Sequence, residues 1–299
     1  MNNTITTETI NKILTKYNKG KGLTRKEKFF YQNIEGTISG NYDFVFTNEE
    51  LNEYTKCSND ILYFIEKYLK RRDTKTGDIK PIKLFTYQKD ILKEYNENRF
   101  LILCTSRQVG ISTLMCIIHL HIMIFNSDKK ILNINNKLCN GVEKIDRIKE
   151  LYLNLPYFLK PGVLSWNKKQ IKFNNNSEIK TASDILQTFD ICHIDNFAHI
   201  PPNIINPIYY KLISSVSSNP NSRITISSSP NGTNLFYDLY EKSQRKTGDP
   251  EKNIFKSISV YWWEVPGRDQ RWKEEKIKML GSKERFEQEY NNQFIIYNK

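Results

Sequence analysis

The sequence lacks any apolar segment long enough to cross a bilayer, and it lacks a secretory signal. Its longest apolar run, 114–125, is interrupted by His119 and His121, and it falls short of the roughly 20 residues that a transmembrane helix needs. The amino terminus is rich in Asn and Thr and has no basic segment followed by an apolar one. We therefore expect no membrane partner and a cytoplasmic location.

Cysteine is scarce, and no low-complexity tract is present. The five cysteines are odd in number, widely spaced and mostly placed in apolar runs, which suits reduced buried thiols better than disulfides or a zinc site. With 38% hydrophobic and 12% aromatic residues among 299, the chain has enough apolar material for a core and is not a disordered tail. Its length fits two domains or one large domain with appendages.

The chain is strongly basic, with a formal charge of +12 and a pI near 9.3. Such a balance attracts nucleic acid and other polyanions. Lysine provides most of the basic residues, and asparagine and isoleucine are abundant, as an AT-rich genome would encode. Composition alone therefore leaves two interpretations open, a DNA-binding surface and a solvated lysine-rich surface.

The order of polar and apolar segments divides the chain into three parts. Residues 1–80 are polar and charged and predict a helical N-terminal region that ends in a turn-rich boundary at 71–78. In 81–265, short apolar runs alternate with amphipathic ones, which is typical of an α/β domain with a mostly parallel sheet and helices on both faces. Residues 266–299 predict a C-terminal helical segment, charged and helical over 272–294.

Periodicity places the elements within these parts. We expect helices in the N-terminal region at 10–17 and 58–69. The strands of the core are predicted at 100–104, 130–135, 189–194, 223–228 and 254–260. The helices between them are predicted at 87–96, 112–125, 140–153, 204–214 and 234–244. A β-hairpin is expected between 166 and 180, turning at 174–177.

The most informative segment is an apolar strand followed by a short polar loop and a helix. The loop and the start of the helix contain Ser106, Arg107, Gln108, Gly110, Ile111, Ser112 and Thr113. In this context, backbone N–H groups and the positive end of the helix dipole can hold a phosphate. Gly110 would allow close backbone approach, Ser112 would bind Mg²⁺ through its hydroxyl, and Arg107 would pair with a β or γ phosphate.

This loop departs from the usual phosphate-binding pattern at one position. Ile111 stands between the last glycine and Ser112, where the pattern has a lysine. An apolar side chain cannot pair with phosphate. Because a strand, a glycine turn and a helix N-terminus also occur in α/β proteins that bind no nucleotide, the loop alone leaves a purely structural interpretation open.

Three further elements lie at matching places. The strand 189–194 is followed by Asp195, about 80 residues after the loop, where an aspartate holds the magnesium of a P-loop ATPase. Its successor is Asn196, which cannot accept the proton that a catalytic glutamate takes. The strand 223–228 runs into three hydroxyls, Ser227, Ser228 and Ser229, which can sense a γ phosphate. Upstream of the loop, Gln88 follows an aromatic residue and offers an amide that can pair with adenine.

In this order, the four elements resemble the ATPase domain of the large terminase subunit of tailed bacteriophages, particularly of the myovirus type. The resemblance spans roughly 57–293. Further segments that look like their family counterparts are 63–68, 106–108, 155–162, 166–168, 197–201 and 230–238.

The resemblance implies a P-loop NTPase of the RecA-like ASCE class that binds ATP and Mg²⁺ and moves double-stranded DNA into a procapsid. It implies the portal protein and the small terminase subunit as further partners, in the host cytoplasm. Carried over by position, Gln88 would contact adenine, and Arg107 would be the in-cis arginine finger. Ser112 and Asp195 would hold the magnesium, Asp195 as the Walker B acid, and Ser227 to Ser229 would form the coupling motif.

Two positions depart from the family, Ile111 and Asn196. Losing a charge-assisted phosphate contact removes about 1.5 to 3 kcal/mol of binding, and losing a general base removes about 10² to 10⁴ in rate. We therefore expect weak nucleotide binding and little hydrolysis. The family continues into a ribonuclease-H-like nuclease domain, whereas this sequence ends where the linker would begin, so we expect either a separate nuclease polypeptide or a lone ATPase-like module.

Three functions remain as alternatives. The first is a packaging ATPase, working or crippled, and the second is a catalytically inactive pseudo-ATPase with a structural or DNA-binding role in the same virus. The third is a helicase-like DNA translocase, disfavoured because no second motor domain fits in the remaining residues. Trp262, Trp263 and Trp272 lie near Arg268 and Arg271 and either pack the C-terminal segment or stack on DNA.

Overall fold

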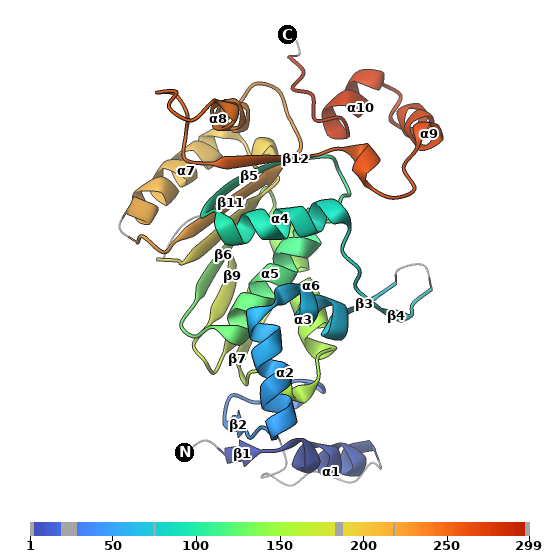
Figure 1. Cartoon of the computed structure of the whole chain (residues 1–299), viewed down its shortest axis with the longest axis vertical. Coiled ribbons are helices and arrows are strands. Elements are labelled where there is room, and N and C mark those ends of the chain that lie inside the picture. Colours follow the sequence, from blue (N-terminus) through green and yellow to red (C-terminus); the bar gives the residue numbers. More distant parts are fainter. Residues whose placement is uncertain (1–2, 19–28, 74–75, 183–187, 218, 297–299) are drawn as a thin grey trace. The chain divides into compact units, whose positions relative to one another are not determined.

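The computed structural model describes residues 3–18, 29–73, 76–182, 188–217 and 219–296, and they form two compact units (Figure 1). The first unit contains Met1–Lys83, Cys116–Lys130 and Val142–Lys180. The second contains Leu84–Met115, Ile131–Gly141 and Thr181–Lys299. The division into 1–80, 81–265 and 266–299 stays a prediction about folding domains.

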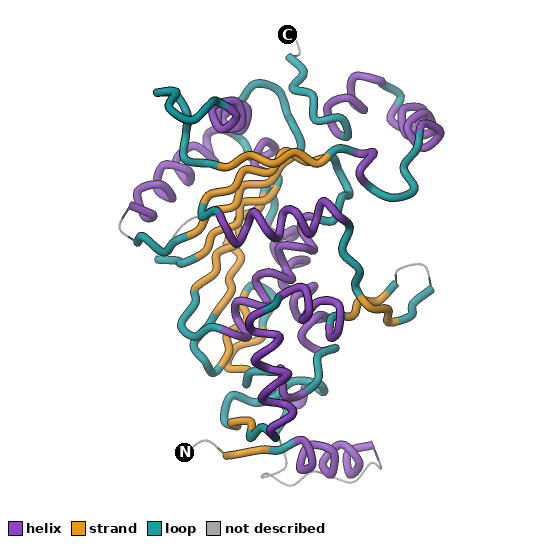
Figure 2. Tube along the Cα trace, in the orientation of Figure 1, coloured by secondary structure: helices purple, strands orange, loops and turns teal. Residues whose placement is uncertain are grey.

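The fold is α/β and is built on an eight-stranded, mostly parallel sheet with the strand order β12-β5-β11-β10-β6-β9-β8-β7. In the second unit, the strands run parallel and side by side (Figure 2). Their bounds are β5 Phe100–Thr105, β6 Lys130–Asn135, β10 Ile191–Asp195, β11 Arg223–Ser228 and β12 Lys256–Val260. Because parallel strands end at the same edge, residues at their carboxyl ends, such as Asp195 and its register partner Ser227, come together.

The two faces of this parallel sheet differ in polarity. On one face, buried apolar side chains such as Ile102, Ile194 and Ile226 pack against α7 and α8 in one continuous core. On the other face, the register places Asp195 beside Ser227 and His193 beside Thr225, and all four are buried. Sheets of this kind are ordinarily apolar on both faces. Buried polar side chains on one face are therefore not explained by core packing alone.

The helices of the second unit lie before, between and after these strands. Their bounds are α4 Thr86–Glu97, α7 Pro202–Ser217, α8 Leu235–Gln244, α9 Gln270–Leu280 and α10 Lys283–Glu289, with 3-10 turns at η3 Phe197–His199 and η4 Trp262–Glu264. Helix α5, Ile111–Phe125, begins in this unit. Trp262 and Trp272 stack with ring centroids 5.7 Å apart and pack against Phe286 and Tyr290, so these two tryptophans serve the packing of the C-terminal segment, while Trp263 is half exposed.

The first unit contains the amino-terminal elements and an antiparallel hairpin. The bounds of its elements are β1 Asn3–Ile5, α1 Thr7–Asn18, η1 Tyr31–Asn33, β2 Tyr42–Phe44, α2 Asn48–Asn59, α3 Ile61–Tyr68, β3 Lys70–Arg72, β4 Ile79–Pro81, η2 Tyr157–Leu159, β7 Val163–Trp166 and β8 Gln170–Phe173. Strand β9, Glu178–Ala182, begins in this unit. Helix α6, Leu138–Leu153, belongs mostly to this unit. Strands β8 and β9 pair antiparallel and turn at 174–177, as predicted.

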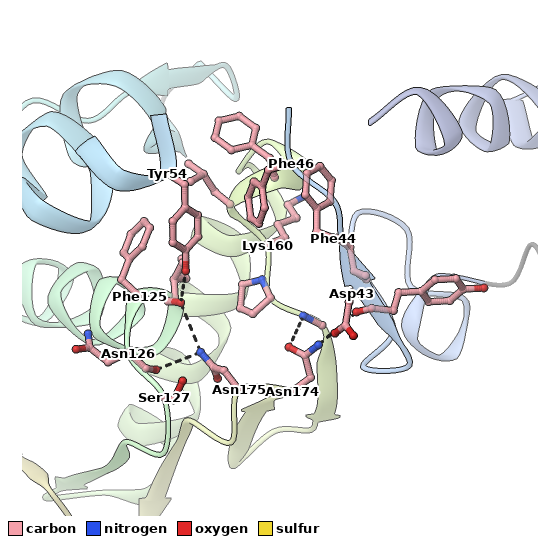
Figure 3. Close-up of a pocket in the computed structure, with 17 residues that line it drawn as sticks. Asp43, Phe44, Phe46, Tyr54, Phe125, Asn126, Ser127, Lys160, Asn174 and Asn175 are labelled. Carbon is pink, nitrogen blue, oxygen red and sulfur yellow. Dashed lines mark hydrogen bonds between the residues drawn. The ribbon is translucent and has the colours of Figure 1, made fainter. Parts of the chain in front are cut away.

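A cavity of about 260 Å³ opens in the first unit between aromatic rings and polar side chains (Figure 3). Lys160, one of its lining residues, is buried and donates hydrogen bonds to the carbonyls of Gly36 and Leu153 at 2.7 and 2.9 Å. Burial lowers the pKa of Lys160 to about 7. The amides of Asn174 and Asn175 are likewise bonded to backbone groups, so these side chains hold loops together.

The structure differs from the predicted elements at three places. The helix predicted at 58–69 is broken at Asp60, whose side chain caps α3 by accepting from the Tyr63 N–H at 3.0 Å. The helix predicted at 272–294 is interrupted at Gly281, which has a left-handed φ of 67°, and the helix ends at Glu289. The turn predicted at 71–78 forms a β3–β4 hairpin; Thr74 and Lys75 lie outside the described residues.

The sequence predicted buried cysteine thiols. Four of the cysteines are buried, and Cys139 is exposed. His119, on α5, is also fully buried. Within the described ranges, no helix combines the length and the apolar character that crossing a membrane requires.

Candidate nucleotide-binding site

The predicted phosphate loop connects β5 to α5 in the second unit. Its backbone adopts left-handed conformations at Gln108, with φ 60°, and at Gly110, with φ 79°. A Cβ on residue 110 would also lie only 2.7 Å from the amide nitrogen of Gln88. The positive φ favours glycine at position 110, and a larger residue there would also have to displace the end of the Gln88 side chain.

Gln88 braces this loop from α4. Its Oε1 accepts a hydrogen bond from the Phe85 N–H at 3.0 Å, and its Nε2 donates to the Val109 carbonyl at 3.2 Å. The Tyr87 hydroxyl donates to the same carbonyl at 2.8 Å. Gln88 is buried, so its amide fixes the loop to the start of α4, and the contact with adenine stays a prediction.

Ser112 and Asp195 meet across the polar face of the sheet. The Ser112 hydroxyl donates to Asp195 Oδ2 at 2.7 Å, and the Ser227 hydroxyl donates to Oδ1 at 2.7 Å. The Asn196 N–H donates to Oδ1 as well, at 3.1 Å. Because both carboxylate oxygens are engaged and the residue is buried, the orientation of Asp195 is fixed. Hydroxyl and carboxylate oxygens are the ligands that Mg²⁺ prefers, so Ser112 and Asp195 fit this ion.

Polar side chains extend this arrangement along the sheet. His193 Nε2 lies 2.9 Å from Ser227 Oγ, and because Ser227 gives its proton to Asp195, His193 is the donor. On β6, Asn135 is the register partner of Asp195, and Asn133 is that of His193. Both asparagines are buried. Sequence reasoning missed these residues, although their alternation in an otherwise apolar strand is a usable signal.

Asn196 has a conformational role that the sequence did not reveal. It adopts a left-handed backbone, φ 56° and ψ 38°, and begins η3. Asparagine tolerates this conformation better than most residues with a Cβ. The absence of a glutamate at this position therefore coincides with a backbone geometry that favours asparagine.

Ile111, at the other departing position, is buried with 6% of its surface exposed. Its side chain belongs to the apolar interior at the start of α5. Ser106 is also buried, whereas Thr113 is partly exposed. The position at which the family has a phosphate-binding lysine thus serves packing in this chain.

Arg107 is held by the C-terminal segment. Its guanidinium forms an ion pair with Glu289 through Nε, and Nη2 donates to Glu289 Oε1 at 3.1 Å. The Arg107 N–H donates to the Glu289 carbonyl at 2.9 Å. Arg268 adds hydrogen bonds to the carbonyls of Arg107 and Gln108 at 3.2 and 2.8 Å. Sequence reasoning missed Glu289, and it named Arg268 only as a neighbour of the tryptophans and not as a partner of the loop.

The three serines at the carboxyl end of β11 and directly after it bind three different parts of the site. Ser227 binds Asp195, Ser228 accepts from the Ala198 N–H at 3.0 Å, and Ser229 donates to Glu289 Oε2 at 3.2 Å. His199 Nε2 lies 2.9 Å from Ser229 Oγ. Burial and the charge of Arg107 lower the pKa of His199, and Glu289 acts in the opposite direction.

Five of the predicted site residues therefore form two connected groups in one unit. Ser112, Asp195 and Ser227 are linked around one carboxylate, and Arg107 and Ser229 are linked around the carboxylate of Glu289. The serine segment 227–229 joins the two groups. His193 and His199 both bond serines, so their place in the site is that of hydrogen-bond donors.

Solved structures of known proteins were compared with this chain, and they include phage large terminases of similar fold. No protein-family model matches the chain. The ATPase domain of the large terminase of Thermus phage P74-26 aligns with a TM-score of 0.56 and 20% identity, covering 71% of this chain and 94% of that domain. The HK97 bacteriophage large terminase aligns with a TM-score of 0.61 and 18% identity.

The chain has the fold of phage large terminase ATPase domains. The alignment covers 79% of this chain and 55% of the HK97 protein. A third large terminase, from a thermophilic bacteriophage and solved in complex with ADP, aligns with a TM-score of 0.53 and 10% identity, covering 71% of this chain and 54% of that one. The chain thus spans about half the length of the longer terminases and nearly all of the isolated ATPase domain.

Proposed function

We propose that this chain is the ATPase module of a viral DNA-packaging motor of the large terminase type, and that it binds ATP with Mg²⁺ and hydrolyses it slowly. The observation that carries the proposal is the placement of Ser112 against Asp195 at the edge of the sheet, 2.7 Å apart. The terminase fold supports the same function, and one terminase of that fold was solved with ADP.

The residues have separate roles in this proposal. The loop 106–110 and the start of α5 hold the phosphates, because backbone N–H groups and the helix dipole favour an anion there. Ser112 and Asp195 hold the magnesium ion, which supplies charge neutralisation at the phosphates when bound. Arg107 is the one basic side chain in the loop and takes the place of the missing lysine as the cation toward the phosphate.

The slow ATP hydrolysis in this proposal follows from the residue after Asp195. Asn196 cannot remove a proton from water, and it lies in a left-handed conformation that a glutamate adopts at a cost. A missing general base lowers turnover by about 10² to 10⁴. We infer slow hydrolysis, with double-stranded DNA, the portal protein and the small terminase subunit as partners in the host cytoplasm.

The same observations favour a second candidate, a pseudo-ATPase with a structural or DNA-binding role in the virus. Ile111 is buried in the apolar interior and Asn196 suits its backbone, so both departures are built into the fold. This candidate predicts that nucleotide, if bound, is not turned over.

A binding titration combined with a phosphate-release assay distinguishes three outcomes, which are slow ATP hydrolysis, nucleotide binding without hydrolysis, and no nucleotide binding. Purified protein is titrated calorimetrically with ATPγS in Mg²⁺ and in EDTA, and phosphate release from ATP is followed over hours. Magnesium-dependent binding with slow release supports the packaging ATPase, and binding without release supports the pseudo-ATPase. No binding in either buffer contradicts the nucleotide site.

A further inference from the structure

We propose that the Asn135 amide binds the water molecule that attacks the γ-phosphate, so that Asn135 orients this water in a chain whose residue 196 is an asparagine. This inference rests on the proposed hydrolysis of ATP. Asn135 is the last residue of β6, and it belongs to the same unit as the phosphate loop and Asp195.

The pairing of β6 with β10 places Asn135 beside Asp195. The two residues are partners in the parallel register, and neighbouring strands lie about 4.8 Å apart. Ser227 is the partner of Asp195 on its other side, on β11. Because register partners project from the same face of a sheet, Asn135 and Ser227 flank the carboxylate that accepts a hydrogen bond from Ser112.

The Asn135 amide has both of its polar atoms buried, and neither forms a hydrogen bond with any residue that the structure describes. The residue as a whole is 8% exposed. A buried amide whose hydrogen bonds are missing destabilises a fold. The hydroxyls of Ser112 and Ser227 are engaged with Asp195, whereas the Asn135 amide has its oxygen and its NH₂ group to offer to a polar ligand.

Packing sets the position of this amide. A Cβ on residue 141, in the first turn of α6, would lie 3.1 Å from Asn135 Nδ2 and 1.8 Å from Thr181 Oγ1. A larger residue at 141 would therefore have to displace the Thr181 hydroxyl, which donates to the Asn133 carbonyl at 3.3 Å. The start of α6 and Thr181 thus crowd the amide from one side, and this packing restricts its movement.

A second buried amide on β6 lies too deep for the same role. Asn133 also forms no side-chain hydrogen bond with the described residues, and its register partner is His193. It is fully buried and lies two residues, about 6.6 Å, further from the carboxyl end of the strand. The contact between Ser112 and Asp195 marks the level of the metal site, and Asn135 is the β6 residue at that level.

An amide has the groups that orient a water toward a phosphate. Asn135 Oδ1 can accept a hydrogen bond from the water, and Nδ2 can donate to an oxygen of the γ-phosphate. The water oxygen forms a bond to the γ-phosphorus, the bond from that phosphorus to the β–γ bridging oxygen breaks, and the proton of the water passes to the released phosphate. The products are ADP and inorganic phosphate. Because an amide does not accept this proton, the step gains from positioning alone and stays slow.

The test measures phosphate release from radiolabelled ATP at saturating concentration, and ATPγS affinity by calorimetry, both with Mg²⁺. The proteins are wild type, Asn135→Ala and Asn135→Leu. Both changes remove the amide, and leucine keeps the number of side-chain heavy atoms. We expect kcat to fall about tenfold to a hundredfold in both variants, while the ATPγS affinity changes by less than about twofold.

Thermal unfolding separates this role from a structural one. Replacing an unpartnered buried amide by an apolar side chain of similar shape is nearly neutral or stabilising. We therefore expect Asn135→Leu to melt no lower than wild type although its turnover falls. A melting temperature that falls together with turnover in both variants would mean that the amide holds the fold, and it would overturn the proposal.

Asn206→Leu is the matched control. Asn206 lies on α7, and its Oδ1 is likewise buried without a hydrogen bond to the described residues. Helix α7 packs on the apolar face of the sheet, away from Asp195, so this variant should turn over ATP as wild type does. An equal loss of turnover in Asn206→Leu and Asn135→Leu would assign the effect to the loss of any buried amide and overturn the proposal.

The remaining outcomes also decide the matter. Unchanged turnover in both Asn135 variants overturns the proposal. Weaker ATPγS binding in Mg²⁺ with unchanged binding in EDTA would make Asn135 a metal ligand and overturns it too. If wild type binds ATPγS but releases no phosphate, this inference fails while the proposed nucleotide site stands. If wild type binds no nucleotide, the proposed function itself fails and the inference fails with it.

Discussion

Ser112 at the start of α5 and Asp195 at the end of β10 lie 2.7 Å apart, measured from Oγ to Oδ2. The contact joins residues 83 positions apart in the sequence. Ser227 holds the second oxygen of the same carboxylate, so Asp195 has one orientation with respect to the loop. A hydroxyl and a carboxylate arranged in this way before a ligand binds reduce the cost of ordering the site when it does.

Neutralising Asp195 tests the magnesium site. In Asp195→Asn, one oxygen becomes an NH₂ group that cannot bind a cation, so we expect Mg²⁺ to lose its effect on nucleotide affinity. Calorimetric titration with ATPγS should then give the same affinity in Mg²⁺ and in EDTA. Asp238→Asn makes the same change at an exposed position of α8 and should keep the wild-type response to Mg²⁺. A magnesium effect that survives in Asp195→Asn would contradict the site.

The fold was predictable because its strands are local apolar runs. Strands 130–135 and 223–228 have the predicted bounds, since each run is bounded by polar residues that end it. The ends of the helices were harder to predict than the strands. Asp60 and Gly281 interrupt helical patterns through capping geometry, and both residues are also compatible with an unbroken helix on periodicity alone.

The sequence predicted only those site residues that belong to one of the ordered motifs. Ser112, Asp195 and Ser227 follow strands that end at one edge, so topology brings them together. Glu289 lies on a charged helix whose acidic residues resemble a solvated surface in the sequence. Its contact with Arg107 depends on how the C-terminal segment returns to the loop, and no local pattern encodes that return.

The buried histidine of α5 makes stability depend on pH. Burial, together with the charge of Lys144, lowers the pKa of His119 from its ordinary value of 6.5 to about 3. The unfolded chain therefore takes up a proton first, so this contribution to stability is full above about pH 6.5 and is lost as the pH falls toward 3. Between pH 7 and 5, the loss from one such group is about 2 kcal/mol.

Replacing this histidine should remove its part of the acid sensitivity. We expect His119→Leu to lose about 2 kcal/mol less unfolding free energy than wild type between pH 7 and 5 in urea titrations. Met123→Leu changes a buried residue of the same helix without a titratable group and should keep the wild-type slope. Equal slopes in wild type and His119→Leu would show that His119 is not held neutral by burial.

Restoring the lysine of the loop tests the role of position 111. Ile111→Lys adds a charge-assisted phosphate contact worth about 1.5 to 3 kcal/mol, which corresponds to about tenfold to a hundredfold tighter ATPγS binding. The variant should also melt at a lower temperature, because Ile111 is buried. Ile111→Met keeps an uncharged side chain and should bind ATPγS as wild type does. Similar affinity in the lysine and methionine variants would refute a phosphate at this place.

Restoring a carboxylate after Asp195 tests the cause of slow turnover. We expect Asn196→Glu to raise magnesium-dependent phosphate release by about 10²-fold, the lower end of what a general base contributes. The lower end applies because the left-handed backbone at 196 costs a glutamate about 1 to 2 kcal/mol.

Asn196→Gln separates the base from the backbone in this experiment. Glutamine has the size of glutamate and meets the same strain at φ 56°, but it cannot accept the proton of water. Its turnover should therefore stay at the wild-type level while its unfolding free energy falls together with that of Asn196→Glu. Equal turnover in the two variants, with equal loss of stability, would show that the residue at 196 does not reach the attacking water, and the slow rate would then need a cause elsewhere in the site.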